Sequence, residues 1–196
     1  MPAFVVEKEF RPILSGEAKA KAENFINEEH SFQEGISELE YYKEFVAACR
    51  RIPKNVFFGR VRVNNEDIIA ELLDLANLHV HIVLDNLIEM YREHNRSIID
   101  GFLEISKKLL TEPQTTAELM DLVEYIDDAR GRLVSSLKER ISEGNKMYFA
   151  LLEFHIFSAA DLELAVTAQT WHRRIQPAFE KSAIVSFIFF GLIFFI

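Results

Sequence analysis

Apolar residues recur every three or four positions along most of this chain, a spacing typical of helices that bury one face. The first such set lies between residues 32 and 49 and consists of Phe32, Ile36, Leu39, Tyr42, Val46 and Cys49. Ser31 and Glu34 form a capping-box pattern that predicts the start of this helix, because each side chain accepts a bond from a backbone N–H at its first turn. Arg50-Arg51 followed by Pro53 predicts its end.

The longest periodic stretch follows Asn64-Asn65, which predict a helix cap. Its apolar positions hold helical spacing for more than forty residues, and they are Ile68, Leu72, Leu75, Ile82, Leu87, Met90, Ile98, Phe102, Ile105 and Leu109. We expect Gly101 to loosen this helix. At 1.5 Å per residue the stretch would extend about 65 Å, and this length favours an elongated bundle or solenoid-like arm over a compact enzyme.

A new helix is predicted after Glu112-Pro113, where Thr115 and Glu118 form a second capping-box pattern. Its apolar positions are Leu119, Leu122, Val123, Ile126, Leu133, Leu137 and Ile141. Glu143-Gly144-Asn145 is expected to bend or end the helix. The next stretch, 146–157, is apolar nearly all round, which predicts burial on most faces. Ser158 and Asp161 then predict another cap.

The segment Val56–Val63 differs from the helical stretches, because it is β-branched and partly alternating. It has no obvious partner strand, so we interpret it as an extended connector, with a short edge strand as the alternative. Residues 1–16 predict an extended lead-in, and 17–30 a helix rich in Ala, Glu and Lys. The predicted fold class is all-α, an elongated bundle of long antiparallel helices with a short extended connector near 56–63.

Composition supports long elements and argues against some partners. The 196 residues include only seven Gly and five Pro, and the net charge is −9. An acidic chain repels a phosphate backbone, so we expect no nucleic-acid binding. The single cysteine, Cys49, cannot form an internal disulfide, and Met1–Arg11 lacks a secretory pattern, so a cytoplasmic location is expected.

The sequence predicts no catalytic, cofactor-binding or metal-binding residue and no cofactor. No Gly precedes Lys and no Gly-x-Gly occurs, so a phosphate-binding loop is absent from the sequence. His79 and His81 are two residues apart and would diverge on a helix, and no Gly-x-Ser-x-Gly occurs. Cys49 lies on the apolar stripe and is interpreted as a core residue. The carboxylate pairs are expected on solvated faces, and they are Glu28-Glu29, Glu38 with Glu40, and Asp127-Asp128.

Two features near the C-terminus leave alternatives open. Trp171 is predicted to anchor a core with its indole N–H hydrogen-bonded, or alternatively to contact a neighbouring domain. Ala183–Ile196 has no charged residue and follows Arg173, Arg174 and Lys181. Its fourteen residues are fewer than the roughly twenty that a spanning helix needs, although the basic flank is one that a membrane anchor would favour.

Five stretches, in this order and spacing, resemble the tail of axonemal dynein heavy chains where it leads into the linker. They are NFINEEHSF (24–32), the helix ending at Ile52-Pro53, FFGRVRVNNEDIIAELLDLAN (57–77), LTEPQTTAELMDLVEYID (110–127) and YFALLEFHIFSAADLELAVTAQTWHRRIQPAFEKS (148–182). His172 stands where that family usually has proline. The segment 183–196 is similar to nothing in the family.

The resemblance implies a helical, force-transmitting lever without its own ATPase site, in a microtubule motor of the cilium axoneme. It implies as partners the intermediate and light chains of dynein and the adjoining linker, with only indirect microtubule association. We therefore divide the chain into a lead-in (1–23), a dynein-tail-like helical region (24–182) and a hydrophobic segment (183–196). That last segment is interpreted as the end of a truncated heavy-chain product. The alternative is a helical adaptor held to a membrane by residues 183–196.

Overall fold

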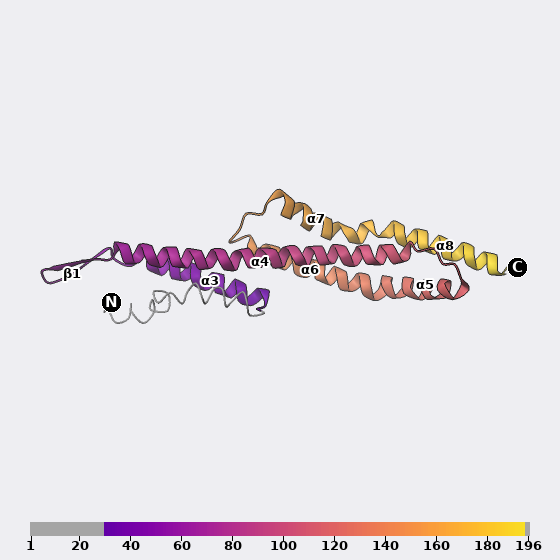
Figure 1. The fold of residues 1–196 in the computed structure, drawn as a ribbon, viewed down its shortest axis with the longest axis horizontal. Helices are drawn as coiled ribbons and strands as arrows, with labels where there is room; N and C mark the ends of the chain where they lie inside the picture. Colours follow the sequence, from indigo (N-terminus) through magenta and orange to yellow (C-terminus); the bar gives the residue numbers. More distant parts are fainter. Residues whose placement is uncertain (1–29, 195–196) are drawn as a thin grey trace. The chain divides into compact units, whose positions relative to one another are not determined.

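The computed structural model describes residues 30–194, and Figure 1 shows how the elements follow one another. In chain order they are α3 (Phe32–Cys49), β1 (Asn55–Phe58), β2 (Val61–Asn64), α4 (Glu66–Leu109), α5 (Thr116–Asp128), the π-helical segment η1 (Ala129–Leu133), α6 (Val134–Leu151), α7 (Ala159–Arg174) and α8 (Gln176–Phe194). The predicted all-α class is confirmed. The predicted lead-in and the helix at 17–30 fall outside the described residues, apart from His30.

The chain divides into two compact units, residues 1–90 and 91–196, and α4 contributes to both. In the first unit, the described core joins α3 to the N-terminal part of α4. Tyr42, Phe45 and Cys49 pack there against Leu72 and Ala76. The capping box of Ser31 and Glu34 is present with both of its backbone bonds. Cys49 is buried, and burial raises the pKa of its thiol, which agrees with its interpretation as a core residue.

The connector near 56–63 is present, and it is a β-hairpin rather than an unpaired extended segment. β1 and β2 pair antiparallel, with Val56 opposite Val63 and Phe58 opposite Val61. The partner strand that we did not identify is the second half of the same stretch. Gly59 has φ +62°, at the first position of the two-residue loop, where a II′ hairpin turn places glycine.

Gly35 in α3 allows close packing against α4. A Cβ atom placed on Gly35 would lie 2.5 Å from Cδ2 of Leu87, which is itself buried. We expect Gly35→Ala to destabilise the protein by about 1 kcal/mol, because overpacking exceeds the gain in helix propensity. Gly131→Ala is the matched control, since nothing lies within 4 Å of its added Cβ. Urea unfolding should show that only the Gly35 variant loses stability; equal effects would contradict close packing at Gly35.

The second unit has a core to which all of its helices contribute. The fully buried residues there include Phe102 and Ile98 of α4 and Ile175 between α7 and α8. The rest of the cluster comes from α4, α5, η1, α6, α7 and α8, as Ile105, Leu109, Leu122, Ile126, Ala129, Val134, Leu137, Ala168, Ala178 and Phe179. Seven of these thirteen residues are apolar positions that the helical spacing predicted, and the other six were not in the predicted sets.

Helix irregularity occurs at a segment that the sequence did not indicate. α4 continues through Gly101, and α6 continues through Gly144 to Leu151, so an end of the helix near Gly144 is wrong, whereas loosening at Gly101 stays a prediction. The irregularity is instead the π-helical segment η1 (Ala129–Leu133), which joins α5 to α6 without a break. One added residue in the turn changes the face that α6 presents relative to α5.

The stretch 146–157 is less buried than predicted. Met147 and Leu151 are buried, but Phe149 and Leu152 are exposed, and Ile156 is 93% exposed. The end of this stretch leaves α6 and forms the loop before α7, which its apolar composition did not indicate. The boundary at 182/183 does not coincide with a helix end, because α8 runs across it from Gln176 to Phe194. Across residues 30–194, none of the helices is both long enough and apolar enough to cross a bilayer.

Candidate functional site

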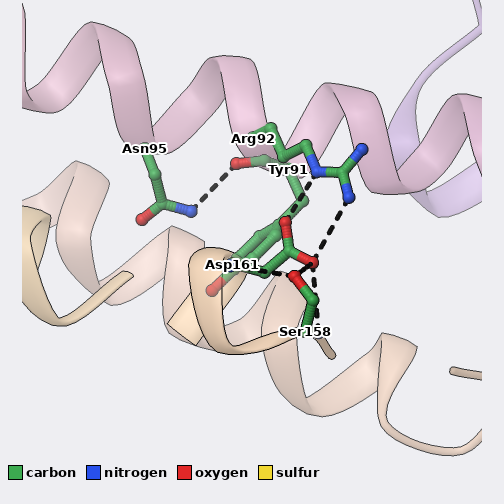
Figure 2. A network of polar contacts seen from close by, with 5 residues as sticks. All are labelled: Tyr91, Arg92, Asn95, Ser158 and Asp161. Atoms are coloured by element: carbon green, nitrogen blue, oxygen red, sulfur yellow. Dashed lines mark hydrogen bonds and ion pairs between the residues drawn. The ribbon is translucent and has the colours of Figure 1, made fainter. Parts of the chain in front are cut away.

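The most connected polar group of the second unit is Asp161, in the first turn of α7 (Figure 2). The predicted cap is confirmed: Ser158 Oγ accepts from the Asp161 N–H at 3.2 Å, and the Asp161 carboxylate accepts from the Ser158 N–H at 3.2 Å. Ser158 Oγ also donates to Oδ2 of Asp161 at 2.6 Å. The capping box therefore fixes both the start of α7 and the orientation of this carboxylate.

Arg92 of α4 binds the same carboxylate from 69 residues away in the sequence. Its Nε donates to Oδ1 of Asp161 at 2.7 Å, and a terminal nitrogen donates to Oδ2 at 3.3 Å. Asp161 is only 4% exposed, whereas the Arg92 side chain is partly open to solvent. Two N–H groups of one guanidinium on one carboxylate make a directional ion pair. This pair connects α7 to α4 within the second unit.

The pKa of Asp161 is lowered to about 2. The hydrogen bond from Arg92 is the main cause, and the bonds from Ser158 add to it against the opposing effect of burial. Asp161 is therefore a carboxylate throughout the physiological range. An acid with so low a pKa is a poor proton donor or acceptor at neutral pH, so its role here is to hold two helices.

Three aromatic rings, from α4, α6 and the loop before α7, pack against one another in the same unit. The Phe157 ring stacks on Tyr148 with a centroid distance of 4.9 Å and lies 5.3 Å from the Tyr91 ring. Burial raises the pKa of the Tyr91 hydroxyl. Asn95 is buried one turn along α4, and its amide donates to the Tyr91 carbonyl at 2.9 Å (Figure 2). We call Tyr91, Arg92, Tyr148, Phe157 and Asp161 the α4–α6–α7 joint.

A second polar contact links α4 to α6 next to the joint. Nε2 of His94 donates to the Arg140 carbonyl at 2.8 Å, and the Arg140 guanidinium donates to Ser97 Oγ. Gly144 gives the His94 ring its room, because a Cβ there would lie 3.2 Å from the ring. Gly144 therefore allows close packing of α6 against His94 of α4.

Ser158→Ala should destabilise the protein by about 1 kcal/mol, the typical loss for a helix N-cap. The change removes the acceptor for the Asp161 N–H and one donor to its carboxylate, while the Arg92 pair remains. Thr115→Ala is the matched N-cap variant. The acidic residue of that cap, Glu118, forms no ion pair with another helix among the described residues. Thermal unfolding should show the larger loss for Ser158→Ala. A larger loss for Thr115→Ala would show that the Ser158 cap does not support the joint.

The cap at Thr115 differs in detail from the prediction. Thr115 Oγ1 accepts from the Glu118 N–H at 3.2 Å, as expected. The Glu118 carboxylate, however, accepts from the N–H of Gln114 at 2.7 Å rather than from that of Thr115. The helix start is therefore correct, and only the returning bond is shifted by one residue.

In the first unit, His79 is buried against α3. Its ring stacks on Tyr42 with a centroid distance of 3.9 Å, and Nε2 lies 3.3 Å from Glu38 Oε1. His81 is exposed, so the two histidines do diverge as predicted. Glu38 is an exception to the expected solvated carboxylates, because it is only partly exposed and faces this histidine.

The other carboxylates and Trp171 gave mixed outcomes. Asp128 pairs on the surface with Arg132 at 2.8 Å, as expected for a solvated helix face, whereas Glu28 and Glu29 fall outside the described residues. Trp171 stacks on Phe102 with a centroid distance of 6.3 Å, which agrees with its predicted core role. Its buried indole Nε1 has no hydrogen-bond partner among the described residues, so the predicted bond is wrong.

These groups do not form a reactive constellation. Among residues 30–194, no group of three or more His, Cys, Asp or Glu side chains could hold a metal ion. Arg92 and Asp161 form an ion pair, and the Ser158 hydroxyl donates to the Asp161 carboxylate as part of the helix cap. The α4–α6–α7 joint is suited to fixing helices rather than to chemistry. Sequence spacing gave the cap of α7 but no signal for Arg92, whose partner is 69 residues away.

Comparison with known proteins connects the chain to the axonemal dynein heavy chains. No protein-family profile matches it. It is 30% identical over 177 residues to human dynein axonemal heavy chain 12, covering 90% of this chain and 6% of that protein. It is 28% identical over 170 residues to the rat protein of the same name, covering 87% and 6%. Mouse dynein axonemal heavy chain 3 is 22% identical over 162 residues, covering 81% and 4%. The chain thus spans about 6% of the length of the first of these relatives.

Proposed function

Because this chain is homologous to a segment of the axonemal dynein heavy chains, we propose that it is a force-transmitting helical segment of such a motor. The single observation that carries the proposal is the similarity to dynein axonemal heavy chain 12 over 90% of the chain. Physical features support it. Helices of 18 to 44 residues with buried interfaces resist bending, and a lever needs that property.

We propose that the segment contributes no ATPase site and that ATP hydrolysis belongs to other parts of the motor. Its partners would then be the adjoining linker and the intermediate and light chains, and its location would be the axoneme of the cilium. The Arg92–Asp161 pair supports this role, because it joins α7 to α4.

A graft into a motor tests the mechanical role. The matching segment of an axonemal dynein heavy chain is replaced by residues 24–182, and microtubule gliding is measured at saturating ATP. We expect gliding to persist with this graft and to be lost with a shuffled sequence of equal length and composition. Gliding that is equally supported by the shuffled segment, or lost with both, would overturn the lever proposal.

A second candidate function is membrane attachment through residues 183–196, favoured by the exposed apolar side chains of Ile184, Phe187 and Ile188 in α8. Fractionation of ciliated cells that express the tagged chain separates the two. The dynein proposal expects the chain in demembranated axonemes and its release by high salt together with dynein subunits. Attachment expects carbonate-resistant membrane association that disappears when residues after Ser182 are deleted.

A further inference from the structure

The hairpin and its flanks carry a concentrated positive charge in an acidic protein. Residues 50–65 contain five cationic side chains and no Asp or Glu, while the whole chain has a net charge of −9. All five are exposed, and they are Arg50, Arg51, Lys54, Arg60 and Arg62. The rest of the chain therefore carries −14, because −9 less +5 is −14. Such segregation creates a local positive potential that attracts acidic groups.

The same hairpin exposes an apolar face. Its register places the opposed pairs Val56–Val63 and Phe58–Val61 on one face. Phe58 and Val61 are each 61% exposed, and Val63 is also exposed. The opposite face carries Arg62, which lies opposite Phe57, and Arg62 Nε donates to Asn55 at 2.8 Å. One face is thus apolar, and the other carries a cation.

The hairpin also has open strand edges. Within the described residues the sheet consists of β1 and β2 only, so each strand has one edge that no other strand pairs. An unpaired edge is a template for a further strand, and a hairpin of two strands has little stability by itself. A third strand would therefore satisfy backbone groups and cover apolar surface together.

We propose that the β1–β2 hairpin binds an extended acidic segment of a partner protein by strand addition. Successive residues of an added strand face opposite sides, so the fitting sequence alternates apolar and acidic residues. The apolar residues would cover Phe58 and Val61, and the acidic residues would lie beside Arg62. Arg60 at the loop would add attraction. The proposal goes beyond the force-transmitting role and does not depend on it.

A synthetic peptide tests the proposal on the full 196-residue chain. The probe is a fluorescein-labelled octapeptide that alternates Glu and Val, and fluorescence anisotropy measures its dissociation constant at 50 and 200 mM salt. We expect saturable binding that weakens with salt. A peptide that alternates Lys and Val should bind at least tenfold more weakly. A Glu-Val peptide with one central proline should also bind at least tenfold more weakly, because proline removes a ladder N–H without changing charge.

Hairpin variants locate the site. Arg60→Glu with Arg62→Glu should weaken binding of the Glu-Val peptide at least tenfold, and so should Phe58→Ser with Val61→Ser. Arg130→Glu with Arg132→Glu is the control pair on η1, matched in charge and spacing, and should leave binding unchanged. All changed side chains of the hairpin are exposed, so helix content by circular dichroism should match the wild type.

Several outcomes would overturn the proposal. The first is that the Glu-Val peptide does not bind. The second is that the proline peptide binds as tightly as the Glu-Val peptide. The third is that the η1 control pair weakens peptide binding as much as the hairpin variants do. Tighter binding of phosphatidylserine vesicles or a DNA duplex through the same arginines would indicate a general polyanion surface instead. Binding that appears only after deletion of residues 1–29 would show that the chain's own N-terminal segment occupies the hairpin.

Discussion

Asp161→Ala is expected to destabilise the second unit by about 3 kcal/mol. This value is near the lower limit for breaking a buried ion pair, because the Arg92 side chain remains partly exposed to solvent. The substitution removes four hydrogen bonds to one carboxylate, two from Arg92 and two from Ser158. It leaves the partly buried Arg92 guanidinium without its counter-charge. Urea unfolding followed by far-UV circular dichroism measures the free-energy change.

Asp128→Ala is the matched control for this prediction. Asp128 also accepts two bonds from one arginine, Arg132, each at 2.8 Å, but that pair lies on the surface four residues apart on one helical segment. An exposed pair of this kind contributes little to stability, because solvent screens the charges, so Asp128→Ala should cost much less than Asp161→Ala. Similar losses for Asp161→Ala and Asp128→Ala would show that burial and interhelical position add nothing to the Arg92–Asp161 pair.

The same carboxylate gives the protein a defined acid sensitivity. The pKa of Asp161 is about 2 when folded, against an ordinary value of 3.8, so the unfolded chain binds the proton more readily. Its stabilisation is therefore complete above about pH 4 and is lost as the pH falls towards 2, by about 2 kcal/mol in all. Asp161→Asn lacks the titrating carboxyl group. The difference in free energy of unfolding between wild type and Asp161→Asn should therefore fall by about 2 kcal/mol between pH 5 and pH 2.

Local rules predicted the parts of the fold that depend on local contacts. Each cap at Ser31, Thr115 and Ser158 needs only residues within three or four positions, and each marks a true helix start. The apolar stripe of α4 needs only helical spacing, and most of its members are buried. The connector was recognised as non-helical, but pairing β1 with β2 required recognition of Gly59 as a turn residue inside the stretch.

Contacts between distant residues had no comparable signal. Arg92 lies on α4 among other charged residues, and only the fold brings it to Asp161. The same holds for Glu38 of α3, which faces the buried His79 of α4. The π-helical segment at Ala129–Leu133 places the buried residues Ala129 and Val134 five positions apart, an interval that three-and-four spacing does not anticipate. Residue spacing therefore predicted the helices, whereas the contacts of the α4–α6–α7 joint depend on tertiary packing.

Phe102→Ala is expected to destabilise the second unit by about 4 kcal/mol, the largest effect of any single change proposed for this protein. Phe102 is completely buried in the centre of the helical core, and its ring is nearly parallel to that of Trp171. Truncation removes the ring from the core and leaves a cavity beside a tryptophan whose indole N–H already lacks a partner among the described residues. Chemical denaturation measures the loss in stability, and Trp171 fluorescence reports the local change.

Leu103→Ala provides the control at the adjacent position of α4. Leu103 is 46% exposed, so its truncation removes little buried surface and should cost less than about 0.5 kcal/mol. Trp171 emission should change in the Phe102 variant, because the ring that stacks on the indole is lost, and should stay unchanged in the Leu103 variant. If both variants lost the same stability, or if emission moved in neither, Phe102 and Trp171 would not form the centre of this core. The force-transmitting role would then lose its main structural support, since a lever depends on a core that holds its helices in fixed positions.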